Sequence, residues 1–157
     1  MRISFDLDEV LFVHPSTHKI EPPPPFPFDH IFKERLRYGA PDLINSLQKL
    51  GYEVWIYTSS FRTERYIKFY FLLYKVRFDG IVNAMRHLKE VQGTRKDILP
   101  QKLPSRYRIS LHIDDEEIVV KNARAYGYRV MRVYEPDEHW AEKIIDEAER
   151  IRKLEEG

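Results

Sequence analysis

The sequence contains no cysteine, which excludes disulfide bonds and every reaction that needs a thiolate. It also lacks any apolar run that approaches the ~18 residues needed to cross a bilayer. Where a secretory signal would need an apolar stretch, the first ten residues carry two aspartates, Asp6 and Asp8. We do not expect the histidines to form a zinc site. These absences predict a cytoplasmic protein without a membrane partner and without a zinc site.

The remaining composition is that of a folded protein. The chain has 157 residues, of which 43% are hydrophobic and 32% are charged. This length supports one domain whose core needs no covalent staples, and this balance is typical of globular proteins rather than disordered ones. We therefore expect residues 1–157 to form a single domain.

The net charge of +1 conceals an uneven distribution. Residues 62–108, here called the basic segment, contain 12 Lys and Arg against 4 Asp and Glu. Such a segment attracts phosphate-bearing partners, including the end of a nucleic acid. The alternative is that these long side chains only solvate the surfaces of helices.

Apolar spacing predicts strands that alternate with helices. Continuous apolar runs such as 54–57 are typical of strands buried on both faces, and apolar residues three and four apart indicate helices. The aromatic stripe at 62–76 is typical of a core face, with base stacking as the alternative. Residues 84–105 have little periodicity and are expected to be irregular. Strands are expected at residues 2–6, 54–57, 80–82, 109–113 and 128–133, and helices at 41–50, 62–76, 116–126 and 138–154.

This alternation predicts an α/β fold, a Rossmann-like parallel sheet of about five strands with helices on both faces. Segment 11–38 interrupts the pattern, because its consecutive prolines favour extended backbone. We expect it to be a flap or an insertion. His112, within the fourth strand, is expected to be a packed residue of the sheet.

Polar residues follow three of the predicted strands. In a parallel sheet, ligands bind beyond the carboxyl ends of the strands. Clustered carboxylates repel one another, and a hard cation such as Mg²⁺, which prefers oxygen ligands, relieves that repulsion. The Thr58 hydroxyl and the free amides of the next helical turn can hold an anion. The residues that follow the first, second and fourth strands are Asp6, Asp8, Thr58, Ser59, Asp114 and Asp115.

Three motifs, in this order, resemble the haloacid dehalogenase (HAD) superfamily, whose members are mostly Mg²⁺-dependent phosphatases. Residues 6–10, Asp-Leu-Asp-Glu-Val, match its first motif. Residues 54–58 end in the threonine of the second motif, and residues 111–115 end in the paired acids of the fourth. Together the motifs cover most of the chain. The resemblance implies a HAD-like phosphomonoesterase.

The resemblance also implies a role for each acid. Asp6 would be the nucleophile that forms an aspartyl-phosphate. Asp8 would protonate the leaving oxygen and then activate water. Mg²⁺ would be held by the Asp6 carboxylate, the backbone carbonyl of Asp8 and Asp115, with Asp114 supporting it through water.

A phosphate-binding set is implied as well. Thr58, with Ser59 beside it, would bind the phosphoryl oxygens. A third-motif lysine would offset the negative charge of nucleophile and substrate. Lys102 is the first choice because it lies closest to the fourth strand, Lys96 is the second choice, and Lys89 is the third lysine available.

Two features bear on substrate access. Glu9 stands where many members of the superfamily have Gly, so it adds a carboxylate beside the site. Large caps of the superfamily insert after the first motif or after the second strand, and neither gap here has room for one. The chain therefore resembles the capless type. An open site suits a phosphorylated macromolecule, such as a protein or a nucleic-acid end, or a small substrate if an oligomer closes the mouth.

Two other functions use the same fold. One is a non-catalytic module that holds a polyanion or nucleic acid with the basic segment. The other is a phosphotransferase, because the sequence does not distinguish water from another acceptor. The presence of both motif aspartates and of the paired acids favours an enzyme, since a binding module has no need of them.

Overall fold

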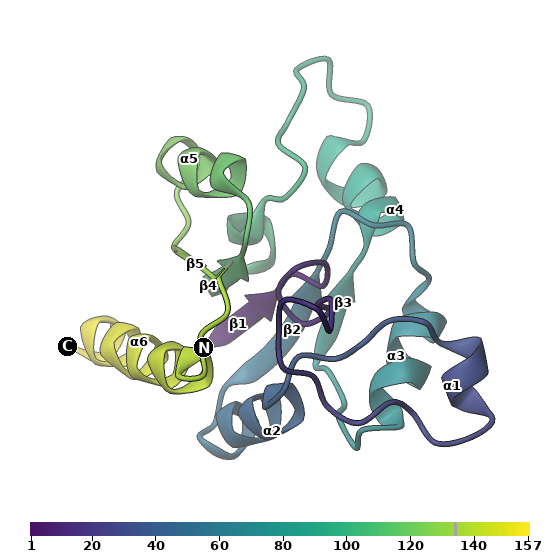
Figure 1. Cartoon of the computed structure of the whole chain (residues 1–157). Helices are drawn as coiled ribbons and strands as arrows, with labels where there is room; N and C mark the ends of the chain where they lie inside the picture. The colour runs from purple at the N-terminus through teal and green to yellow at the C-terminus, as the bar shows by residue number, and fades with distance from the viewer. Residues whose placement is uncertain (134) are drawn as a thin grey trace.

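The computed structural model describes residues 1–133 and 135–157. Within them, five strands form one parallel sheet in the order β3-β2-β1-β4-β5 (Figure 1). The strand order reverses at β1, which lies between β2 and β4. The predicted α/β, Rossmann-like fold is therefore confirmed. The strands are β1 (Arg2–Phe5), β2 (Glu53–Tyr57), β3 (Gly80–Val82), β4 (Ile109–Asp114) and β5 (Val130–Arg132).

Helices cover both faces of the sheet. Their bounds are α1 (Phe28–Ile31), α2 (Ala40–Lys49), α3 (Glu64–Leu72), α4 (Ala84–His87), α5 (Glu117–Tyr126) and α6 (Trp140–Glu156). Figure 1 shows α2, α3 and α6 on one side of the sheet and α4 and α5 on the other. No helix of the described residues is both long enough and apolar enough to span a bilayer.

Strand β2 shows why the molecule is layered. Val54 and Ile56 pack into the larger core cluster, together with side chains from α2, α3 and α6. Trp55 and Tyr57 belong to a second cluster. Because successive side chains of a strand point to opposite faces, a strand with four consecutive apolar residues, 54–57, needs a cover on both faces. This burial places the end of β2 inside the molecule, next to β1.

Helix α3 is shorter than the predicted 62–76. It begins after Thr63, whose side chain accepts a hydrogen bond from the Tyr66 amide (3.1 Å), an N-cap. The chain leaves the helix before Lys75, which adopts a φ of 59°. The aromatic stripe is only partly a core face, because Phe69 is 44% exposed. The buried side chains of the helix are Ile67, Tyr70 and Phe71.

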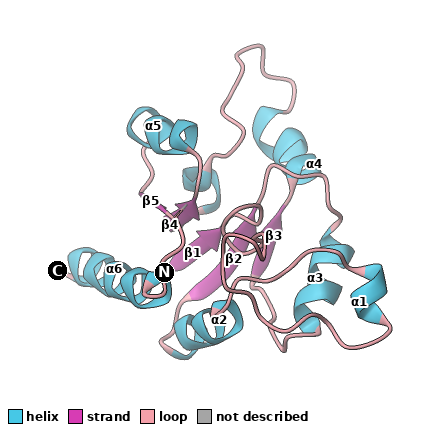
Figure 2. Cartoon of the chain, in the orientation of Figure 1, coloured by secondary structure: helices cyan, strands magenta, loops and turns pink. Residues whose placement is uncertain are grey.

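The region expected to be irregular, 84–105, contains α4, a π-helical turn (Leu88–Gln92) and the start of a 3₁₀ turn (Pro104–Tyr107). These turns are too short to leave a periodic pattern, and Figure 2 shows a long loop after α4. The loop is fixed by tertiary contacts. His87 is 2.5 Å from the Tyr57 hydroxyl and 2.9 Å from the Pro100 carbonyl oxygen, and the Leu103 amide donates to the same hydroxyl (2.9 Å).

Segment 11–38 is attached to the core at both ends. Leu11 and Phe12 near its start and Phe32 and Leu36 near its end are buried in the larger cluster. The segment also includes α1, a helical turn where the prolines predicted none. A flap, if the segment forms one, is therefore limited to the residues between these anchors.

Candidate active site

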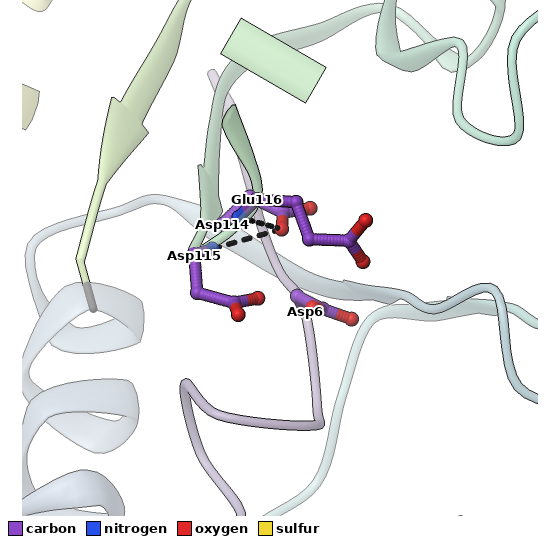
Figure 3. Close-up of side chains that lie close together, drawn as sticks. All are labelled: Asp6, Asp114, Asp115 and Glu116. Atoms are coloured by element: carbon purple, nitrogen blue, oxygen red, sulfur yellow. Dashed lines mark hydrogen bonds between the residues drawn. The ribbon is translucent and has the colours of Figure 1, made fainter. Parts of the chain in front are cut away.

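The register of β1 against β4 brings the acidic residues together. Phe5 pairs with Ile113, and the Asp6 amide donates to the Ile113 carbonyl oxygen (2.9 Å). Asp6 and Asp114 therefore emerge side by side at the carboxyl edge of the sheet, where the strand order reverses (Figure 3). This is the place where open α/β sheets bind ligands. Carboxylate oxygens from four residues lie within 4.8 Å of one another: Asp6, Asp114, Asp115 and Glu116.

A buried lysine joins this cluster. Lys102 Nζ lies 3.1 Å from Asp6 Oδ1 and 2.5 Å from Asp114 Oδ2, and its side chain is 1% exposed. Of the three lysines considered, the structure brings this one to the carboxylates. Lys96 and Lys89 are exposed.

Asp114 holds the lysine in place. Its Oδ2 also contacts His112 Nε2 (2.7 Å), and its Oδ1 accepts from the amides of Asp115 (2.8 Å) and Glu116 (3.1 Å). His112 is fully buried in β4, and its Nδ1 lies 2.7 Å from Ser4 Oγ. The histidine is thus a packed residue of the sheet, as expected. It also holds the Asp114 carboxylate through the contact of its Nε2.

The charges of the cluster are not balanced. Burial raises the pKa of Asp6 well above its usual value, and the charges of Asp114 and Asp115 add to this effect against the opposing pull of Lys102. Burial and the Asp114 charge raise the pKa of Asp115 to about 6. Although burial also disfavours the Asp114 anion, its bonds to His112 and Lys102 lower the pKa of this carboxyl. One lysine therefore faces three carboxylates, and a further cation would stabilise their charged forms.

The donor set fits Mg²⁺. It consists of carboxylate oxygens, which are the ligands that this hard cation prefers, and Asp6 is only 3% exposed. Asp114 has its oxygens committed to protein donors, so Asp6 and Asp115 are the carboxylates better placed to hold the ion. Glu116 was missed by the sequence analysis, although it directly follows the paired acids.

The Asp8 side chain makes a different contact. Arg62 binds it with both terminal nitrogens, Nη1 to Oδ2 at 3.0 Å and Nη2 to Oδ1 at 2.9 Å. Arg62 Nε also donates to Glu34 Oε1 (3.3 Å), and the Tyr66 hydroxyl donates to Glu34 Oε2 (2.6 Å). The Asp8 carboxylate, 56% exposed, is thereby tied to α3 and to segment 11–38. Nothing in the sequence signalled Arg62 or Glu34, because only the folded chain brings them to Asp8.

The phosphate-binding residues expected after β2 lie beside the cluster. Thr58 is 1% exposed, and its amide donates to the Val82 carbonyl oxygen (2.9 Å). Its hydroxyl interacts with Ser60, donating to Oγ and accepting from the amide, both at 3.1 Å. Ser59 is half-buried. Both residues follow the strand next to β1, but the contacts of Thr58 are with its own loop rather than with the carboxylates.

The backbone at Glu9 adopts a conformation that glycine reaches more easily than any other residue. Its φ is 65°, a left-handed conformation that costs a residue with a Cβ about 1–2 kcal/mol. The turn is closed by the Leu7 carbonyl oxygen, which accepts from the amides of Leu11 (3.0 Å) and Phe12 (2.8 Å). The loop that follows β1 therefore carries backbone strain at Glu9 that a glycine would not.

Cavity size alone would not have located this site. A pocket of about 900 Å³ lies between α1 and α3, lined mainly by apolar side chains such as Phe32, Phe69 and Leu72. None of the four clustered acids lines it. The site is identified by its titratable groups instead.

Comparison with known proteins gives structural neighbours. No family model and no curated protein matches the sequence. A predicted HAD-like family hydrolase from Porphyromonas gingivalis has a TM-score of 0.55 at 13% identity, covering 95% of this chain and 97% of that one. A HAD-superfamily hydrolase, subfamily IA, variant 1, from Geobacter sulfurreducens has a TM-score of 0.56 at 13% identity, with coverages of 92% and 97%. This is a HAD-like fold.

A third neighbour is longer. A chain of the Pnkp1/Rnl/Hen1 complex has a TM-score of 0.55 at 16% identity over 87% of this chain, but the match spans only 46% of that neighbour. At these identities the comparisons establish the HAD-like fold and leave the chemistry to the residues of the site.

Proposed function

We propose that the protein is a Mg²⁺-dependent phosphomonoesterase of the HAD superfamily, of the capless type. The observation that carries this proposal is the position of Lys102 between Asp6 and Asp114, with Asp115 beside them, where the strand order reverses. In this arrangement the Asp6 carboxylate can serve as the nucleophile. The buried lysine beside it supplies a positive charge for the phosphoryl group.

In the proposed reaction, an Asp6 oxygen attacks phosphorus and the bond to the leaving oxygen breaks. Asp8 donates a proton to that oxygen, and the product is an aspartyl-phosphate on Asp6. Asp8, now a carboxylate, takes a proton from water as the water attacks phosphorus and releases phosphate. Lys102 keeps Asp6 in place and offsets the charge of the transferring group, and Thr58 and Ser59 bind its oxygens.

Asp6, Asp115 and the backbone carbonyl of Asp8 would hold Mg²⁺. When bound, the ion would neutralise charge on nucleophile and substrate. Charge at Asp6 matters because its raised pKa favours the protonated form, which is a poor nucleophile. The ion and Lys102 both act against that shift.

The Asp8–Arg62 pair bears on the first step. The two-nitrogen contact with Arg62 fixes the direction of the Asp8 carboxylate. We therefore propose that Arg62 positions Asp8 for proton transfer to the leaving oxygen.

The substrate is proposed to be a phosphate monoester, small or macromolecular, in an open site. A nucleic-acid end remains one candidate, since Arg65, Arg95 and Lys96 of the basic segment are exposed. Two cations of that segment, Arg62 and Lys102, are already committed to acidic partners. A cytoplasmic location and closure of the site by an oligomer stay proposals as well.

The direct test is a panel of phosphorylated metabolites, nucleotides, phosphopeptides and oligonucleotides with terminal phosphates, assayed for phosphate release with Mg²⁺ and with EDTA. Mg²⁺-dependent release from at least one class supports the proposal. Transfer of phosphate to an added alcohol instead of water would identify a phosphotransferase. Tight binding of a polyanion without turnover would support the non-catalytic alternative.

A further inference from the structure

A second pocket lies away from the acidic cluster. It has a volume of about 560 Å³ and is lined by residues of segment 11–38 and by the chain that leads into α6. This volume is within the range of small-molecule sites. None of the four clustered acids lines it. Its lining includes His18, Lys19, Arg37, His139 and Trp140.

Arg37 is a buried cation of this pocket. The charge of Asp137 acts on it, but no carboxylate of the described residues forms an ion pair with it. The residue is 3% exposed, and its Nη2 donates to the Glu135 carbonyl oxygen (3.1 Å). The guanidinium lies over the Trp140 ring, 4.4 Å from the centroid. Within residues 1–133 and 135–157, its Nη1 is buried without a hydrogen-bond partner. A buried charge without a partner is costly, so an anion from outside the chain would stabilise it.

His18 provides a second unfilled position. Its Nδ1 lies 2.8 Å from Thr17 Oγ1, whereas its Nε2 is buried and has no partner among the described residues. His18 and Arg37 line the same pocket. Burial and the Arg37 charge lower the pKa of His18, against the opposing charge of Glu9. When unprotonated, this ring nitrogen can accept a hydrogen bond from a hydroxyl group; when protonated, it can donate one to an oxygen. Either contact suits an oxyanion such as phosphate, which has oxygens and can carry a proton.

The rim of the pocket carries charges of both signs. Asp137 is paired with Lys143 (2.5 Å), which offsets its charge. Glu142 lies 3.6 Å from His139, a residue that offsets it only when protonated. Glu138 is exposed and has no ion pair within the described part of the chain. Its carboxylate therefore opposes an anion at the rim.

We propose that this pocket is a binding site for a small oxyanion, a phosphate or carboxylate group, seated on Arg37 Nη1 and His18. This site shares no residue with the acidic cluster and does not depend on the proposed hydrolysis. Lys19 at the rim adds a positive charge on the approach to the site.

The test uses Trp140 as a local reporter, since its Nε1 donates to the carbonyl oxygen of Tyr38 (3.1 Å), another lining residue. The two indole N–H resonances of the chain are followed by ¹⁵N–¹H NMR during titration with sodium phosphate, sulfate or acetate, against sodium chloride at equal ionic strength, with EDTA present. We expect a saturable shift of the Trp140 resonance with a Kd in the millimolar range and no shift of Trp55. Comparison of the three oxyanions identifies the preferred group.

Variants decide whether the anion sits on Arg37. Arg37→Met should weaken binding at least tenfold, whereas Arg35→Met, which removes a guanidinium bonded to nearby backbone carbonyls, should leave it unchanged. If Arg37→Met does not fold, Glu138→Gln provides the test, because loss of the rim carboxylate should tighten binding severalfold. Three results would overturn the proposal: no saturable shift with any oxyanion, a shift retained in folded Arg37→Met, or an affinity unchanged by Glu138→Gln.

Discussion

Lys102 Nζ lies 3.1 Å from Asp6 Oδ1, and both side chains are almost fully buried. Although burial alone would lower the pKa of Lys102, the attraction of Asp6 and Asp114 raises it, so the lysine is charged. This pair gives the site its proposed nucleophile and its proposed counter-charge in one contact.

Replacement of Lys102 should therefore affect both rate and stability. We expect Lys102→Ala to lower kcat/KM by about 10²–10³, the usual loss when one contact to a developing charge is removed. It should also destabilise the fold by about 3–5 kcal/mol, because the buried carboxylates lose their partner. Steady-state kinetics well below the melting temperature, with circular dichroism, separates the two effects. Lys96→Ala and Lys89→Ala are the matched controls and should stay within about tenfold of wild type.

A large loss in Lys96→Ala instead would move the third-motif lysine to that position and leave the phosphatase proposal standing. If none of the three lysines matters, the proposed mechanism does not apply to this protein.

Replacement of Asp114 and replacement of Asp115 should have different effects on Mg²⁺ binding and on the stability of the fold. Asp115→Ala should weaken Mg²⁺ binding more than Asp114→Ala does, because Asp114 already accepts hydrogen bonds from four protein groups. Asp114→Ala should cost more stability, since it removes an acceptor that the buried Lys102 and His112 share. Calorimetric titration with Mg²⁺ and thermal melting of both variants check this crossed pattern. Equal effects of the two changes on both readouts would contradict it.

Much of the fold was predictable from the sequence, because local patterns determine it. The strands at 54–57 and 109–113 are apolar at most positions and were placed within a residue or so of β2 and β4. The acids that follow β1 and β4 meet because parallel strands in register end at one edge. Those inferences need only periodicity and topology.

The remaining features depend on contacts between distant segments. The position of Lys102 is set by bonds of its loop to Tyr57 and His87, which no spacing rule reveals. The Asp8–Arg62 contact joins residues 54 positions apart. Arg37 gives no signal in the sequence, because an arginine is ordinarily exposed and only the packing of α6 buries it.

Arg62 should control the acid–base residue. Arg62→Ala releases the Asp8 carboxylate from its two-nitrogen contact, and we expect about a 10- to 100-fold loss in kcat/KM for esters with poor leaving groups, which need a well-placed proton. Activated aryl phosphates should lose much less. The measurement is kcat/KM across aryl phosphates of graded leaving-group pKa. The matched control is Arg65→Ala, an exposed neighbour, and an equal loss for good and poor leaving groups would contradict this role.

Mg²⁺ affinity should rise with pH. The pKa of Asp115 in the metal-free fold is about 6, above its usual 3.8, so the folded state binds more protons than the unfolded chain between these values. This carboxyl therefore contributes less stability as pH rises from about 4 to 6, and Mg²⁺ competes with the same proton. We expect Mg²⁺ to raise the melting temperature more at pH 7.5 than at pH 5. In Asp115→Asn the gain should be smaller and less dependent on pH, because Asp6 is then the one remaining carboxylate ligand with a raised pKa. A larger gain at pH 5 than at pH 7.5 in wild type would contradict the assignment.

The central claim is that Asp6 is the nucleophile of a Mg²⁺-dependent phosphatase. The most direct measurement is phosphate release from an activated aryl phosphate by wild type and by Asp6→Asn, each with Mg²⁺ and with excess EDTA. The account predicts turnover only by wild type with Mg²⁺, because an amide cannot form the aspartyl-phosphate. Folded Asp6→Asn that keeps more than a few per cent of the wild-type rate, or undiminished wild-type activity in EDTA, would contradict it.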